Sequence, residues 1–240
     1  MANDTFGEIG GAVSKRELKI FWLVDISGSM QGDKIATVNR AIKAVIPELK
    51  DASEENPEIQ MYVQAMKFGS GAYWHNTSAI KIEEYKWSDL TVGGVTDMGG
   101  ALRLMAQELT PEKMGQRAIP PVLILMSDGE ATDDYDGGLK ELLGQKWAQK
   151  SVRIAIAIGH DANTEELIKF CSHPKENPPL VAERASELIK FIRWASVEVS
   201  KSVSTSVISP SSGAPVNIPA PPQPQVTIGG SAQDDDDDVW

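Results

Sequence analysis

The 240-residue sequence contains one cysteine, Cys171, and only three histidines, His75, His160 and His173. A single cysteine cannot form a disulfide within the chain, and a lone thiol at this length predicts a reducing compartment. Cys171 stands among apolar residues of a predicted helix, so we interpret it as a small buried residue rather than a nucleophile. The histidines do not have the spacing of metal ligands, which argues against a histidine-based metal site.

Basic residues and long apolar runs are also scarce. Lys and Arg number 23 against 34 Asp and Glu, which gives a formal net charge of −11. This charge argues against nucleic acid and anionic membranes as partners, because both require a basic surface. No run of about 18 apolar residues occurs, which excludes a spanning helix, and the first residues, MANDTFGEIGGAVSKRE, contain no apolar core of a secretory signal. We therefore expect a cytoplasmic protein.

Motifs of several common enzyme classes are missing as well. The sequence has no G-x-x-x-x-G-K-[ST] phosphate loop, no G-x-S-x-G nucleophile turn and no H-E-x-x-H zinc motif. A metal-dependent hydrolase, commonly built around two metals about 4 Å apart, would need more carboxylates than the sequence offers next to Asp25. These absences argue against an enzyme, and a metal-dependent hydrolase is the weaker alternative.

The most informative stretch that is present is FWLVDISGSM, residues 21–30. An apolar run, typical of a buried strand, ends at Asp25 and is followed at once by Ser27 and Ser29. Carboxylate and hydroxyl oxygens are ligands of hard divalent cations. Gly28 allows the backbone to turn tightly between the two serines.

Apolar runs and helical periodicities alternate along the chain. Together they predict an α/β sandwich with a mostly parallel sheet and an antiparallel hairpin at its edge. The predicted strands are 18–24, 59–68, 72–75, 120–126, 152–158 and 180–182. The predicted helices are 33–52, 97–109, 139–150, 164–171 and 186–199. Pro47 predicts a kink or an early end of the first helix.

In open sheets of this kind, ligands bind beyond the carboxyl ends of the strands. Asp25 and Asp128 both follow apolar strand runs directly. The glycine-rich segment GGVTDMGGALRLM, residues 93–105, contributes Thr96 and the predicted helix cap Asp97. The other acidic residues near this rim are interpreted as a solvated loop, with a second ion as the alternative; they are Asp97, Glu130, Asp133 and Asp134.

This three-loop pattern resembles the metal-ion-dependent adhesion site of von Willebrand factor type A domains. The family signature is D-x-S-x-S on the first loop, a threonine on the second and an aspartate on the third. The matching parts are DISGS, the threonine of GGVTDMGGAL and the aspartate of MSDGE. The resemblance covers roughly residues 17–200 and implies a Rossmann-like three-layer sandwich with helices on both faces of the sheet.

The resemblance also implies a role for each site residue. Ser27 and Ser29 are expected to bind the metal directly, Thr96 directly or through water, and Asp25 and Asp128 through water. The cation is expected to be Mg²⁺, with Mn²⁺ or Ca²⁺ as alternatives, and a protein partner is expected to offer it an aspartate or glutamate. The alternative is a structural assembly subunit whose closed metal site only rigidifies the loops.

Within the family, the chain is most similar to TerY-like bacterial proteins in residues 18–32, 93–104 and 122–131. This similarity implies a tellurite-resistance, stress or phage-defence system with Ser/Thr kinase or phosphatase partners. The expected domains are an N-terminal arm (1–16), the α/β domain (17–200) and a disordered Ser/Pro-rich linker with an acidic tail (201–240). The aspartates at 234–238 could occupy a metal site, and Trp240 could anchor a partner.

Overall fold

The structure, a computed structural model, describes residues 15–160, 162–208 and 217–223. In this part of the chain, seven strands form one sheet in the order β3-β2-β1-β5-β6-β7, and β4 also pairs with β2. Their bounds are β1 Arg16–Asp25, β2 Ile59–Gly69, β3 Gly71–Trp74, β4 Ile80–Lys81, β5 Val122–Ser127, β6 Val152–Ile158 and β7 Leu180–Ala182.

The sheet is mostly parallel, as the sequence predicts. β1 pairs in parallel with β2 and β5, and β6 continues the parallel arrangement to β7. The edge strand β3 and the two-residue β4 run antiparallel to β2. Every residue of β5 is buried, because helices cover both faces of a parallel sheet.

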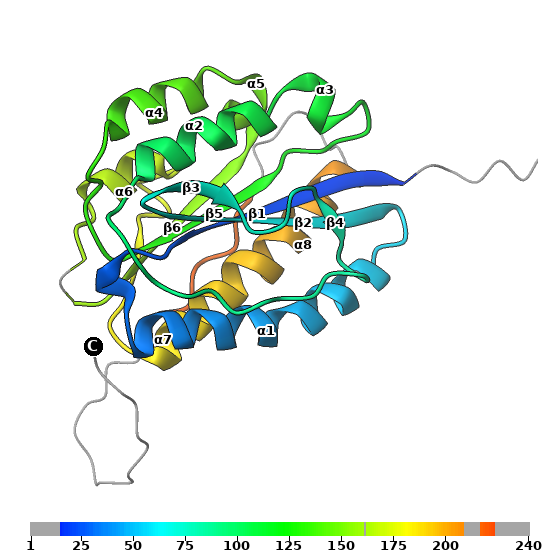
Figure 1. Ribbon diagram of the computed structural model, residues 1–240. Helices are drawn as coiled ribbons and strands as arrows, with labels where there is room; N and C mark the ends of the chain where they lie inside the picture. Colours follow the sequence, from blue (N-terminus) through cyan, green and yellow to red (C-terminus); the bar gives the residue numbers. More distant parts are fainter. Residues whose placement is uncertain (1–14, 161, 209–216, 224–240) are drawn as a thin grey trace, which may run out of the picture.

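Helices cover both faces and complete three layers (Figure 1). Helices α2 to α6 lie on one face, and α1, α7 and α8 lie on the other. Their bounds are α1 Asp33–Glu54, α2 Met98–Glu108, α3 Pro111–Met114, α4 Tyr135–Leu143, α5 Lys146–Lys150, α6 Glu165–Phe170, α7 Ala185–Arg193 and α8 Val199–Ile208. No helix in the described residues is both long and apolar enough to cross a membrane.

Helix α1 does not end at Pro47, so the early end that the sequence allowed is wrong. It continues to Glu54 because the turn around Pro47 is held by buried side chains on its inner side, among them Val45 and Leu49. Pro47 itself is exposed, so water can satisfy the carbonyl that lacks a proline N–H partner. The helix predicted over 139–150 is interrupted at Gly144 and Gln145 and forms α4 and α5 instead.

The predicted start of the linker at residue 201 is wrong. The helix predicted to end at residue 199 continues through a π-helical turn, η2 Trp194–Glu198, into α8. Val199 and Val203 are fully buried in the core, which holds α8 against the sheet. Serine and threonine have weak helix propensity, and here the hydroxyls of Thr205 and Ser206 bond to backbone carbonyls four residues earlier.

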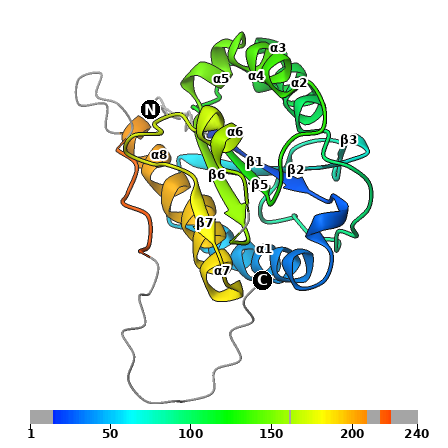
Figure 2. The ribbon, with the colours of Figure 1, turned by 90° about the vertical axis from the view of Figure 1, so that its left-hand side faces the viewer.

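Part of the predicted linker also returns to the domain. Residues 217–223 run beside α8 (Figure 2), Ile218 packs against the same core, and the Ser202 hydroxyl donates to the carbonyl of Asn217. The predicted N-terminal arm up to residue 14, the aspartates at 234–238 and Trp240 lie outside the described residues.

Candidate metal centre

The loops after β1, before α2 and after β5 lie at the carboxyl ends of the parallel strands. The first is held to the second by two backbone hydrogen bonds: Gly28 N donates to Gly94 O at 3.1 Å, and Gly93 N donates to Ile26 O at 2.7 Å. Gly94 has a φ of 95°, and a Cβ at this position would lie 2.3 Å from Ser70 Oγ. Only glycine can therefore occupy this position against Ser70, in the turn between β2 and β3.

Three of the predicted site residues form a continuous chain of polar contacts. Ser27 Oγ lies 3.0 Å from Ser29 Oγ, and Ser29 Oγ donates to Asp128 Oδ1 at 2.8 Å. Ser27 and Asp128 are buried, whereas Ser29 is exposed to solvent. The structure thus brings two hydroxyls and one carboxylate together at an accessible point of the rim.

Asp25 is fully buried beneath this chain and shapes the first loop. Its Oδ1 accepts from Ser27 N at 2.7 Å, and its Oδ2 accepts from the hydroxyl of Ser127 at 2.6 Å. Burial raises the pKa of the Asp25 carboxyl, and the charge of Asp128 adds to this effect, while the hydrogen bonds from Ser127 and Ser27 oppose it. Protein donors thus engage both oxygens of the Asp25 carboxylate beneath the rim.

Thr96 lies in the second loop and is 6% exposed. Its backbone is locked to the third loop: Thr96 N donates to Thr132 Oγ1 at 3.1 Å, and Thr132 N donates to Thr96 O at 2.9 Å. The Thr96 hydroxyl lies 4.0 Å from the Cβ position of Gly129, the residue after Asp128. Thr96 therefore lies at the rim but outside the chain of contacts that joins the serines to Asp128.

The acidic residues around the rim have partners within the protein. Asp97 does not cap α2 with its side chain but accepts from Gly71 N at 2.6 Å. The carboxylate of Asp133 takes over the capping role and accepts from the first-turn amides of Gly99 and Gly100. Asp134 accepts from Gly137 N and pairs with Arg103, and Glu130 accepts from Asn163. These contacts favour a structural role over a second ion.

Two residues that touch the site did not emerge from the sequence. Ser127, the last residue of β5, orients Asp25. Lys34, in the first turn of α1, places Nζ 2.8 Å from Asp128 Oδ2. The nearness of Lys34 to DISGS, at the start of the helix that leaves the rim, is the signal that could have identified it.

The donor set at the rim suits a hard cation. In the described residues, no group of three or more His, Cys, Asp or Glu side chains could hold a metal. A metal centre in this part of the chain would therefore have to use hydroxyl oxygens beside one or two carboxylates. Oxygen ligands of this kind match Mg²⁺, Mn²⁺ and Ca²⁺ rather than a soft metal.

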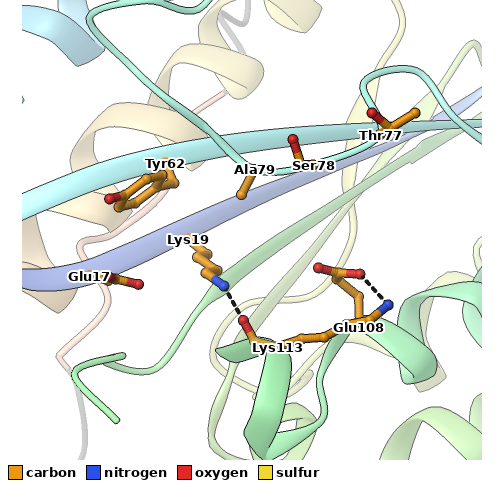
Figure 3. A pocket seen from close by; sticks show the side chains of 8 residues that line it. All are labelled: Glu17, Lys19, Tyr62, Thr77, Ser78, Ala79, Glu108 and Lys113. Carbon is orange, nitrogen blue, oxygen red and sulfur yellow. Dashed lines mark hydrogen bonds and ion pairs between the residues drawn. The ribbon is translucent and has the colours of Figure 1, made fainter. Parts of the chain in front are cut away.

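A separate pocket of about 450 Å³ lies at the opposite end of β1, near its first residues (Figure 3). The ammonium of Lys19 donates to the carbonyl of Lys113, and Lys113 Nζ pairs with Glu108 at 2.8 Å. Burial lowers the pKa of Lys19. The charged groups at its centre thus already pair with the protein, and none of the predicted metal ligands lines this pocket.

A sequence model described as von Willebrand factor type A domain matches residues 20–193. This match spans the three rim loops, the sheet from within β1 to β7, and the chain through α7. A search of curated proteins gives no match.

Several solved structures share the fold. A von Willebrand factor type A protein from Catenulispora acidiphila is 18% identical, with a TM-score of 0.59 over 79% of this chain and 43% of that one. The pilus adhesin SpaC from Lactobacillus rhamnosus GG is 12% identical, with a TM-score of 0.61 over 78% of this chain and 31% of that one. Proximal thread matrix protein 1 from the mussel byssus, solved with a zinc-occupied MIDAS motif, is 19% identical, with a TM-score of 0.55 over 76% of this chain and 48% of that one. The chain therefore spans less than half the length of each.

Proposed function

The chain belongs to the von Willebrand factor type A domain family, and from this premise we propose that it is a non-enzymatic interaction module with a divalent cation at its rim. Ser27, Ser29 and Asp128, with Thr96 beside them and Asp25 beneath, would hold the cation. The cation would in turn bind an acidic side chain of a protein partner. The observation that carries the proposal is the contact chain from Ser27 through Ser29 to Asp128.

The spacing of the hydroxyls supports Mg²⁺. Ligands about 2.0–2.1 Å from an octahedral ion are about 2.8–3.0 Å apart along each edge. Ser27 Oγ and Ser29 Oγ are 3.0 Å apart, which fits that edge. The zinc-occupied MIDAS motif of the mussel protein supports a divalent cation at this type of site.

The same ligand set supports an acidic partner. Serine and threonine hydroxyls leave most of the ionic charge uncompensated, and Asp25 is already engaged by protein donors. A carboxylate from outside can supply the missing negative charge in a charge-assisted interaction with the cation. Ser29 is exposed, so such a group can approach from solvent.

The cellular setting in this proposal is a bacterial tellurite-resistance, stress or phage-defence system in the cytoplasm. The resemblance of residues 18–32, 93–104 and 122–131 to TerY-like proteins supports this setting. The same resemblance supports a Ser/Thr kinase or phosphatase as the partner that supplies the carboxylate. Nucleic acid and membranes are not expected to bind, because the chain carries a net charge of −11.

A structural assembly subunit is the alternative function. It is favoured by the ion pair between Lys34 and Asp128, which satisfies the third-loop carboxylate from within the chain. In such a subunit the cation would only rigidify the loops, and its affinity would not respond to an acidic ligand. A metal-dependent hydrolase is weaker, since the site offers two carboxylates and no cluster for a second metal in the described residues.

Affinity capture from bacterial lysate tests the proposal. The tagged protein is compared in Mg²⁺, in EDTA and as the Ser27→Ala/Ser29→Ala variant. The matched control is Ser202→Ala/Ser206→Ala, which makes the same double change on α8. A partner that is lost with EDTA and with the rim variant, but retained by the control, supports metal-dependent recognition. A partner retained in all conditions contradicts it.

A further inference from the structure

The carboxylate of Asp128 is held from two sides. Ser29 Oγ donates to its Oδ1, and Lys34 Nζ lies 2.8 Å from its Oδ2. The ion pair is shielded from water, because the side chain of Lys34 is 12% exposed and that of Asp128 is 1% exposed. Salt therefore screens this pair much less than an exposed one.

We propose that Lys34 is a resident cation that lowers the affinity of the rim for a divalent metal. The metal is then held firmly only when a partner adds its own carboxylate. This inference rests on the proposed function. In it, Lys34 is the residue that makes metal binding depend on the partner.

Lys34 already offsets the charge of Asp128 in a buried ion pair. A divalent cation at this point adds two positive charges beside the ammonium, and a partner carboxylate offsets part of that excess. Charge left uncompensated in a buried cluster is costly, so the state with metal and partner is favoured over the state with metal alone.

Geometry leads to the same conclusion. Lys34 engages the carboxylate of Asp128, whereas that of Asp25 is occupied by Ser27 and Ser127. The ammonium therefore competes with a cation for the negative charge of Asp128. A partner carboxylate offsets the excess positive charge, so Lys34 weakens the binding of metal alone more than the binding of metal together with the partner, and this difference is a positive coupling between the two.

The test is the dissociation constant of Mn²⁺, measured by electron paramagnetic resonance at fixed ionic strength. Replacing Lys34 by methionine removes the charge and keeps most of the apolar stem. We expect Lys34→Met to bind Mn²⁺ about tenfold more tightly than the unchanged protein. Lys34→Gln is the second variant in case Lys34→Met does not fold. An unchanged or weaker affinity in the folded variant overturns the inference.

Two comparisons separate direct competition from general repulsion. Lys43→Met removes a lysine of the same helix that pairs with Asp89, and it should leave Mn²⁺ affinity unchanged. In an Asp128→Asn background, Lys34→Met should have little further effect, because the competed charge is gone. A full tenfold gain in that background would show that Lys34 acts without Asp128 and would overturn the inference.

Failure of this inference can be distinguished from failure of the proposed function. If Ser27→Ala/Ser29→Ala binds Mn²⁺ like the unchanged protein, the site itself is wrong. If that variant loses Mn²⁺ while Lys34→Met gains nothing, the site stands and only the role of Lys34 is refuted.

Discussion

The hydroxyl of Ser127 donates a 2.6 Å hydrogen bond to Oδ2 of Asp25. The two residues end the adjacent parallel strands β5 and β1, one step beyond the register pair Val24 and Met126. This bond joins the two central strands at the point where they release the rim loops. It also directs the carboxylate of Asp25 toward Ser27 N, which fixes the turn that carries the serine hydroxyls.

Removal of the Asp25 carboxylate should therefore destabilise the domain as well as the site. Asp25→Ala leaves Ser27 N and the Ser127 hydroxyl without their acceptor in a fully buried position. We expect a loss of about 1–3 kcal/mol in the free energy of unfolding, measured by urea denaturation. Asp51→Ala, an exposed change on α1, should alter stability by no more than about 0.5 kcal/mol. Equal effects of the two would contradict the account.

Asn39 should hold the segment that leads to the second loop. Its Oδ1 accepts from Trp87 Nε1 and from Leu90 N, both at 2.9 Å, and its Nδ2 donates to Leu90 O at 3.0 Å. Asn39→Ala should cost about 1–3 kcal/mol in unfolding free energy and accelerate hydrogen exchange at the Leu90 amide. Unchanged exchange at Leu90 would mean that the segment is held by other contacts.

Helix α8 should contribute to stability, although its composition resembles that of a linker. Val203 is fully buried, so Val203→Ala should reduce the unfolding free energy by about 2 kcal/mol through lost burial and a cavity. Thr205→Ala, an exposed change on the same helix, should leave stability nearly unchanged. If thermal unfolding of both variants matches the unchanged protein, residues 201–208 do not pack as described.

Cys171 should be unreactive in the folded protein. It is 5% exposed, and burial raises the pKa of its thiol to about 11. At pH 8 only about one thiol in a thousand is then ionised, and the thiolate is the nucleophile. A disulfide reagent should react rapidly only after unfolding in urea. The unfolded thiol has a pKa of about 8.5, so the unfolded state gains from ionisation as the pH rises from there to about 11. Stability should fall over that interval.

Much of the fold was predictable because parallel strands covered on both faces read as unbroken apolar runs. β5 and β6 are examples. The sequence also placed Asp25, Ser27, Ser29, Thr96 and Asp128 on three loops that the structure brings to one rim. Their convergence follows from the rule that parallel strands deliver their carboxyl ends to the same edge.

The parts that sequence did not predict depend on contacts between distant residues. Helix α1 tolerates Pro47 because this residue faces solvent. The apolar periodicity that predicts the helix does not show whether a proline at such a position will interrupt it. The helical state of residues 201–208 depends on burial of Val203 in the core. Helix α2 is capped by Asp133 rather than by Asp97. This cap depends on a hydrogen bond from the amide of Gly99 to a residue 34 positions later in the chain. Lys34 becomes part of the site only through the path of α1 past Asp128.

The most direct test of the central claim is anomalous diffraction from crystals grown with MnCl₂. The account predicts a manganese peak about 2.2 Å from both Ser27 Oγ and Ser29 Oγ, with Asp128 beside it. The same experiment on Ser27→Ala/Ser29→Ala should show no peak at the rim. Crystals of the unchanged protein with no manganese at Ser27 and Ser29, or with manganese bound only elsewhere, would contradict the assignment of this rim as a divalent cation site.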